Sequence, residues 1–439
     1  QAGRPSSGSD KAMPMRPQSA VIALLVAALI LPQFCESAFA RKAHKSHNKS
    51  HRSLSASHRA HKHVAKSKAD TIAQPSVPAS ASGTAKPRLM SRAEILNTDP
   101  QRLANLGRHV IVGYHQLSDV KALVKARAIA GVFITDHNVR GRKVEAVKAD
   151  IDALQDIRRE QDLPPLIIAA DQEGGTVSRL SPPLRRQRSL GTILTKVEHD
   201  EERRKLVESY ARTQAGELTR VGVNMNFGPV VDLNLNPGNH RDGETRLRLR
   251  AISSDPYIVA KVAGWYCDTL AESGIMCTLK HFPGLGRVTR DTHVASAEIS
   301  ASEGTLELND WVPFRRLMGK ANVATMLGHV KVSVLDKTTP ASYSRAIVDT
   351  LMRQTWNHEG LLVTDDFSMG AITRGQPGLG EAAVKALNAG VDFLLLSYSE
   401  KHLDAMYSAL IAADEAGQID ANARAQSRAR IDRVFAVRP

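Results

Sequence analysis

From residue 92 onward, short unbroken apolar runs alternate along the chain with longer amphipathic stretches. Within the runs, polar and apolar positions do not alternate, so the runs predict parallel strands that are buried on both faces. The stretches at residues 144–161, 201–221 and 257–273 place apolar side chains at helical spacing and predict helices between the strands. The predicted strands are 109–115, 131–136, 166–171, 225–232, 276–281, 324–329, 361–365 and 391–397.

Eight strand–helix units in succession are typical of one architecture. They predict an α/β fold, a (β/α)8 TIM barrel, that forms a single catalytic domain over residues 92–439. An open doubly wound sheet is the alternative, but no Gly-rich dinucleotide fingerprint follows the first predicted strand. The barrel is therefore the prediction.

The first 91 residues have a different pattern. An apolar run at residues 20–34 lies between Arg16 and a small-x-small tripeptide that ends at Ala40, which predicts a secretory signal peptide over residues 1–40, with an N-terminal extension. An uncleaved membrane anchor is the alternative. Residues 41–91 are rich in His, Lys, Ser and Pro and predict a disordered basic linker. We therefore expect a secreted or periplasmic protein.

Composition narrows the classes of partner. The net charge of +14 would favour an anionic partner, but nine Lys and Arg against one Asp lie in residues 41–70 alone. We interpret this segment as a solvated spacer, as a contact with anionic cell-wall polymer or a membrane surface, or as an adventitious metal binder through its histidines. Nucleic acid is not expected, because no aromatic residues interleave with the charges.

The cysteines are few. Three in 439 residues exclude a disulfide scaffold. An oxidising compartment would allow Cys267 and Cys277 to pair, but one lies in a predicted helix and the other beside a buried strand. We expect two buried thiols.

Ionisable side chains end six of the eight predicted strands. A strand-end hydrogen bond is an adequate explanation for any one of them, but not for six strands together. Because the loops at the carboxyl ends of barrel strands converge over one cavity, the pattern indicates an enzyme. The residues are Asp136, His137, Asp171, Asp232, Lys280, His281, His329 and Asp365.

Three motifs at strand ends carry the candidate chemistry. They are DQEGGTVSR at residues 171–179, KHFPGLGRVTRDTH at 280–293 and VTDDFSMGA at 363–371. In this order they resemble the barrel domain of glycoside hydrolase family 3, especially its bacterial single-domain β-N-acetylhexosaminidases, over about residues 95–400. The chain departs from that pattern at Leu285 and Thr292, where the family more often has His and Ser. Residues 250–256 match a further family element only weakly.

The residues and the resemblance agree on a reaction. A retaining glycosidase needs a nucleophile on one side of the anomeric carbon and a proton donor on the other. Asp365 ends a buried strand and is predicted as the nucleophile, with a helix N-cap as its alternative role. Asp366 is expected to point away and to be structural. His293 is predicted as the acid/base, with Asp291 orienting its imidazole; without the surrounding motif, a loop histidine would be merely exposed.

The resemblance also implies a subsite for a terminal N-acetylglucosamine. Carboxylates and basic side chains at the other strand ends can bond to hydroxyl and acyl oxygens of a sugar. Asp232 and His329 are interpreted as structural. No metal or other cofactor is expected, because the histidines lack a ligand spacing. The predicted substrate-binding residues are Asp171, Arg179, Arg250, Lys280 and His281.

The sequence thus predicts a retaining glycoside hydrolase that removes terminal non-reducing β-linked N-acetylglucosamine from peptidoglycan fragments or related oligosaccharides. One alternative is a β-glucosidase of the same family. Another is phosphorolysis, because a neutral histidine tolerates an incoming phosphate better than a carboxylate does. The last is a non-catalytic cell-wall-binding barrel, although a binder would need neither Asp365 nor the Asp291–His293 pair.

Overall fold

The computed structural model describes residues 88–235, 245–397 and 400–436. The predicted signal peptide and basic linker lie outside these ranges. Within the ranges, no helix combines the length and the apolar character that crossing a bilayer requires.

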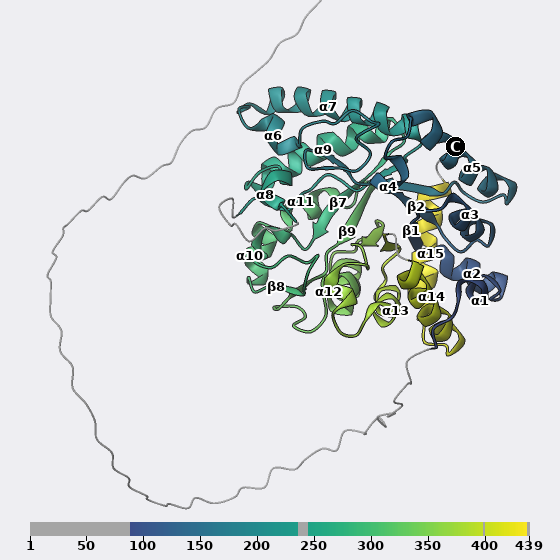
Figure 1. Ribbon diagram of the computed structural model, residues 1–439. Helices are drawn as coiled ribbons and strands as arrows, with labels where there is room; N and C mark the ends of the chain where they lie inside the picture. Colours follow the sequence, from purple (N-terminus) through teal and green to yellow (C-terminus); the bar gives the residue numbers. More distant parts are fainter. Residues whose placement is uncertain (1–87, 236–244, 398–399, 437–439) are drawn as a thin grey trace, which may run out of the picture. The chain divides into compact units, whose positions relative to one another are not determined.

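Eight parallel strands form the central sheet (Figure 1). Neighbouring strands follow the order β11-β9-β7-β6-β3-β2-β1-β12. A parallel bridge between Val363 and Phe393 joins the two end strands, so the sheet closes into the predicted barrel. The strands are β1 (Val110–Gly113), β2 (Gly131–Ile134), β3 (Ile167–Ala170), β6 (Met225–Asn226), β7 (Met276–Phe282), β9 (Val323–Leu327), β11 (Leu362–Thr364) and β12 (Leu394–Leu396).

A helix follows each barrel strand (Figure 1). Helices α1 (Arg92–Leu96) and α2 (Pro100–Gly107) precede the first strand, and α15 (Ala421–Ala436) follows the last unit. The helices of the eight units are α3 (Leu117–Lys125), α5 (Val144–Glu160), α7 (Asp200–Val221), α9 (Pro256–Glu272), α11 (Val312–Leu317), the π-helix η3 (Ala346–Thr355), α13 (Leu379–Ala389) and α14 (Glu400–Glu415).

Helix boundaries follow local chemistry. The Asp255 carboxylate accepts hydrogen bonds from two backbone N–H groups in the first turn of α9, and Pro256 occupies the first helical position, where its missing N–H is harmless. Helix α7 has three acidic residues in its first turn, which suits the positive end of the helix dipole. It ends at Gly222, whose φ of 82° lies in the left-handed region that favours glycine.

Apolar layers on both faces of the sheet explain why the strand sequences are continuous apolar runs. On β1, Val110 and Val112 pack in the cluster shared with the helices, whereas Ile111 belongs to a second cluster contributed by alternate residues of the other strands. Ile431 of α15 joins this inner cluster and packs over the amino-terminal end of the barrel. Burial on both faces removes the polar positions that would otherwise show a period of two.

One predicted strand is much shorter than expected. The prediction covered residues 225–232, but β6 is only Met225–Asn226. Pro229 has no N–H to give to the strand ladder, so regular pairing stops before it. The chain rejoins the sheet through a bridge between Val230 and Lys280, which keeps the following Asp232 close to β7.

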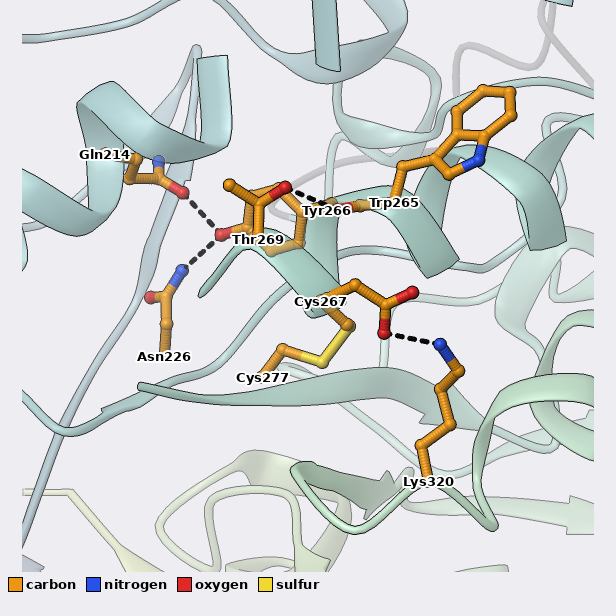
Figure 2. Close-up of a disulfide and its surroundings, with 9 residues drawn as sticks. Gln214, Asn226, Trp265, Tyr266, Cys267, Thr269, Cys277 and Lys320 are labelled. Atoms are coloured by element: carbon orange, nitrogen blue, oxygen red, sulfur yellow. Dashed lines mark hydrogen bonds and ion pairs between the residues drawn. A yellow bond between two sulfur atoms is a disulfide. The ribbon is translucent and has the colours of Figure 1, made fainter. Parts of the chain in front are cut away.

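The prediction of two buried thiols is wrong. Cys267 of α9 and Cys277 of β7 are buried but form a disulfide, with their Cα atoms 5.5 Å apart (Figure 2). Helix α9 leads directly into β7 and packs on it, so a helix residue that faces the sheet meets an outward-facing strand residue. That Cα separation is within the range that a disulfide spans.

Two small sheets extend the loops at the carboxyl ends of the strands. The hairpin β4 (Gln172–Gly174) and β5 (Val177–Ser178) is formed by the first motif. Strand β8 (Ala297–Ile299) pairs in parallel with β10 (Val330–Val332), which ties the chain after β7 to the chain after β9. The remaining short helices are α4 (Asp136–Val139), α6 (Leu190–Leu194), α8 (Leu247–Arg250), η1 (Leu285–Arg287), α10 (Glu303–Leu308), η2 (Ala341–Tyr343) and α12 (Gly370–Thr373).

Candidate active site

The carboxyl ends of the barrel strands surround a cavity of about 410 Å³. The structure brings seven of the predicted site residues to its wall, and the eighth, Asp291, contacts His293 there. The seven are Asp171, Arg179, Arg250, Lys280, His281, His293 and Asp365. His115, Asp136, His137, Glu173 and Asp366 join them in the lining.

Asp365 lies immediately after β11 and is half-buried. Its backbone N–H donates to the carbonyl of Leu327 on the neighbouring β9, and its carboxylate accepts the N–H of Asp366 at 2.9 Å. Burial by itself raises the pKa of the Asp365 carboxyl, but the nearby His281, His329 and His293, together with this N–H, lower the pKa below its ordinary value. Asp365 is therefore an anion at neutral pH.

Asp366 is held by hydrogen bonds, in line with its predicted structural role. Its carboxylate accepts the backbone N–H groups of Ser368 at 2.9 Å and Ser397 at 2.8 Å, and both serine hydroxyls as well. These contacts connect the loop after β11 to the end of β12. Asp366 also lines the cavity, so it does not point fully away from the site.

His293 and Asp291 form the predicted pair. Nδ1 of His293 lies 2.8 Å from the Asp291 carboxylate, which also accepts the backbone N–H of His293 at 2.9 Å. Thr245 adds its N–H at 3.0 Å and its hydroxyl at 2.9 Å. Burial raises the pKa of Asp291, but the hydrogen bonds from His293 and Thr245 outweigh it and lower the pKa to about 2. The ionised carboxylate thus accepts a hydrogen bond from Nδ1–H of His293, which leaves Nε2 for proton exchange.

The loop that carries His293 docks on the loop that carries Asp365. The backbone N–H of Gly370, at the start of α12, donates to the carbonyl of His293 at 2.9 Å, and that of Ala371 donates to Thr292 at 3.3 Å. A Cβ at position 370 would lie 2.5 Å from the carbonyl oxygen of Val294. The glycine of the VTDDFSMGA motif is therefore required for this close approach.

Sequence reasoning missed Glu173. Its buried carboxylate receives two bonds from the Arg250 guanidinium, at 2.6 and 2.8 Å, and lies 2.6 Å from Nζ of Lys280. Lys280 also contacts Asp171 at 2.6 Å. The available signal was the spacing: Asp171 and Glu173 stand two residues apart at a strand end, which can place both side chains on one face.

The charges in this network stabilise one another. Burial raises the pKa of Glu173, but Arg250 and Lys280 overcome it and hold the pKa at about 2. Burial lowers the pKa of Lys280, but Asp171 and Glu173 bring it above its ordinary value. The Glu173 carboxylate and the Lys280 ammonium therefore stay charged at neutral pH.

Asp232 and His329 do not line the cavity but lie behind its wall. The Asp232 carboxylate lies 2.7 Å from Nδ1 of His281 and accepts hydrogen bonds from the backbone N–H groups of His281 and Leu285. His329 is buried between the hydroxyl of Ser342 at 2.8 Å and the carbonyl of Asp366 at 3.0 Å. Asp232 thereby fixes the orientation of the His281 ring in the cavity.

Arg179 reaches the cavity as an exposed side chain after β5. His115 and His137 lie beside each other across the same opening, with ring centroids 4.6 Å apart. Across the described ranges, no three His, Cys, Asp or Glu side chains converge in a way that could hold a metal ion.

Known proteins resemble this chain in sequence and fold. The model of the glycosyl hydrolase family 3 N terminal domain matches residues 101–434. The beta-hexosaminidase of Xylella fastidiosa (strain M23) is 34% identical over 285 residues, which are 64% of this chain and 79% of that protein. Beta-hexosaminidase LpqI of Mycobacterium tuberculosis is 31% identical over 333 residues, 74% of this chain and 80% of that protein.

The fold of the chain is also similar to that of a solved glycosidase structure. The glycoside hydrolase family 3 beta-N-acetylglucosaminidase of Paenibacillus sp. str. FPU-7 matches with a TM-score of 0.69 at 30% identity, over 76% of this chain and 62% of that one. The chain thus spans less than two thirds of the Paenibacillus enzyme.

A closed barrel with a charged cavity at its carboxyl end, together with these relatives, defines the chain as a barrel glycosidase. Because the family model covers residues 101–434, the chain belongs to glycosyl hydrolase family 3. The predicted fold, family and enzyme class are confirmed. The alternative of a non-catalytic cell-wall-binding barrel is not supported.

Proposed function

We propose that the chain is a retaining β-N-acetylhexosaminidase that removes terminal non-reducing N-acetylglucosamine from peptidoglycan fragments or related oligosaccharides. The observation that carries the proposal is the convergence of Asp365 and the Asp291–His293 pair on one cavity. The choice of sugar is supported by the names of the relatives, two beta-hexosaminidases and a beta-N-acetylglucosaminidase.

In the first step the Asp365 carboxylate attacks the anomeric carbon. The bond from that carbon to the leaving oxygen breaks, and Nε2–H of the imidazolium of His293 gives its proton to the departing oxygen. Asp291 stays anionic because its pKa is about 2, so it holds the ring through Nδ1–H and stabilises the imidazolium.

In the second step water replaces the enzyme on the sugar. Neutral His293 takes a proton from the water at Nε2, the water oxygen attacks the anomeric carbon, and the bond to Asp365 breaks. Phosphate in place of water would make the reaction a phosphorolysis, and a product assay with and without added phosphate separates the two outcomes.

The paired charges around Glu173 would bind the sugar. Lys280 and Arg250 are fixed by Glu173, and Asp171 is fixed by Lys280, so these polar atoms are ordered before substrate arrives. Preorganised donors and acceptors bind hydroxyl and acyl oxygens with little ordering cost. His281, oriented by Asp232, would add a further contact.

The preference of the enzyme for N-acetylglucosamine over glucose is tested with two aryl substrates. We expect the enzyme to release chromophore from an aryl β-N-acetylglucosaminide with kcat/KM at least about 10²-fold above that for the matched β-glucoside, a difference of about 3 kcal/mol in transition-state free energy. The reverse preference would favour the β-glucosidase alternative.

The role of His293 is tested by varying the leaving group. His293→Ala should cripple aryl substrates with poor leaving groups, which need the proton, and spare strongly acidic leaving groups in the first step. Glycosyl-enzyme should then accumulate on Asp365, and Asp291→Ala should show a weaker version of the same pattern. A uniform loss across all leaving groups would mean that His293 binds the sugar and that another residue is the acid.

We also propose that the chain is exported from the cytoplasm. The Cys267–Cys277 disulfide supports it, because disulfides persist in oxidising compartments. Cell fractionation with N-terminal sequencing of the mature chain tests both the location and the expected cleavage after Ala40.

A further inference from the structure

The barrel has a second hollow at the amino-terminal end of its strands, the end away from the catalytic cavity. Its walls include residues just before β1, β2 and β12, residues at the start of β3, and part of α15. Its volume of about 190 Å³ corresponds to about six waters of liquid volume, which leaves room for a phosphoryl group with a small attached body. Four arginines line it: Arg108, Arg127, Arg158 and Arg428.

The positive charge in this hollow is largely uncompensated. Asp432 is the one carboxylate among the lining residues, and it lies 3.3 Å from Arg108 and 3.5 Å from Arg428. Arg158 donates from Nε to the carbonyl of Pro164 at 3.1 Å. Within the described part of the chain, neither Arg127 nor Arg158 forms an ion pair.

Two further features show that these arginines have an unused hydrogen-bond donor and repel one another. Nε of Arg108 is buried and has no hydrogen-bond partner among the residues that the structure describes. Burial, and then repulsion from Arg127 and Arg108, lowers the pKa of Arg158 to about 10. Like charges held together at a partly buried site oppose folding, so this cluster is suited to a ligand that brings negative charge.

The side chains that line the hollow limit the chemical class of ligand that it can bind. A guanidinium fork binds phosphoryl oxygens two at a time. A phosphate monoester carries nearly two negative charges at neutral pH, so it balances the three surplus positive charges better than a carboxylate does. Leu163, Pro164, Pro165 and Phe435 supply accessible apolar surface beside the arginines, which suits a compact apolar body on the phosphate.

We propose that this hollow is a binding site for a phosphate monoester with a compact apolar body. The ligand would be either a soluble phosphate ester or the head group of an anionic lipid, which share this chemistry. The site is separate from the catalytic cavity, and the proposal does not depend on which sugar the enzyme cleaves.

Calorimetric titration of the full chain with phenyl phosphate tests the site. We expect saturable one-to-one binding that is weakened at least about tenfold by Arg127→Asn or Arg158→Gln, because each removes a charge-assisted bond. Asn suits position 127, where φ is 56°. The matched control is Arg159→Gln, on the same helix as Arg158: Arg159 pairs with Asp156 and does not line the hollow.

A second readout separates binding from structure. Without ligand, Arg127→Asn and Arg158→Gln should unfold at the wild-type temperature or above it, because they relieve repulsion, and turnover of an aryl substrate should be unchanged. The proposal is overturned if phenyl phosphate does not bind, if benzoate binds equally tightly, or if Arg159→Gln weakens binding as much as the hollow variants. A clear loss of thermal stability in both hollow variants would instead assign the arginines a structural role.

Vesicles that contain phosphatidic acid identify the source of the phosphate. Co-sedimentation that phenyl phosphate abolishes would identify a lipid head group. Binding of phenyl phosphate to a chain that does not co-sediment with these vesicles, or whose co-sedimentation phenyl phosphate leaves unchanged, would identify a soluble ester.

Discussion

Glu173 is the residue on which the charge balance of the catalytic cavity depends. It contacts both buried cations of the cavity, Arg250 and Lys280, while Asp171 contacts only Lys280. Without Glu173, Arg250 would keep its bond to the carbonyl of Thr245 but would lose its carboxylate partner. Removing one member of a buried ion pair strands the other charge in a medium that solvates it poorly.

Glu173→Gln should therefore lower both stability and activity. We expect the free energy of unfolding in urea to fall by about 3 kcal/mol and kcat/KM to fall by about 10²-fold as Lys280 and Arg250 shift. Glu217→Gln is the control, because Glu217 pairs with the exposed Arg220 on the surface of α7. Equal stability of Glu173→Gln and wild type would contradict the assignment.

The difference in unfolding free energy between wild type and Glu173→Gln should depend on pH with a defined sign. The pKa of Glu173 is held at about 2, below its ordinary value of 4.5. Its ionised form thus contributes stability that is fully present above pH 4.5 and is lost as the pH falls towards 2. The gap in unfolding free energy between wild type and Glu173→Gln should narrow on acidification through this window.

The neighbours Asp365 and Asp366 should respond oppositely to truncation. Asp365→Ala removes the proposed nucleophile and should reduce turnover by several orders of magnitude with little change in thermal unfolding. Asp366→Ala frees the N–H groups of Ser368 and Ser397 and should cost more stability but much less activity. Turnover and melting temperature of both variants check this, and reversed effects on turnover would place the nucleophile at Asp366.

At the scale of elements, the docked His293 loop is open to a direct test. Gly370→Ala would place a Cβ 2.7 Å from the carbonyl oxygen of His293, so the loop must move away from Asp365. We expect kcat/KM for an aryl substrate with a poor leaving group to fall about 10²-fold. Gly304→Ala is the control, because a Cβ there meets no atom within 4 Å. Wild-type kinetics in Gly370→Ala would show that the docked position is not needed.

The elements themselves could be predicted because burial on both faces and helical spacing are local signals. The stretch predicted as a helix at residues 144–161 is α5, Val144–Glu160. The contacts that complete the site are not local: Glu173 meets Arg250 across 77 positions, and Thr245 meets Asp291 across 46. Such pairs, like the Cys267–Cys277 disulfide, depend on which faces the closed barrel brings together, and no pattern within one segment specifies that.

At the scale of the whole molecule, the closed barrel separates two clusters of charged side chains, one at each end of its strands. The catalytic cavity at one end balances its cations with carboxylates, whereas the arginine hollow at the other end does not. A surplus charge within a small hollow suits a small anion. The basic segment at residues 41–70, by its composition, suits an extended polyanion instead, since its nine Lys and Arg are spread over thirty residues.

Removal of residues 41–90 should therefore leave turnover of a small soluble substrate unchanged and weaken retention on anionic wall material. Retention by the full chain should fall steeply as salt rises, because exposed charges are screened beyond a Debye length of about 10 Å at 0.1 M. A full-length variant with the nine Lys and Arg of residues 41–70 changed to Gln separates charge from spacing: it should behave like the truncated chain. If both variants are retained as well as wild type, the segment is only a spacer.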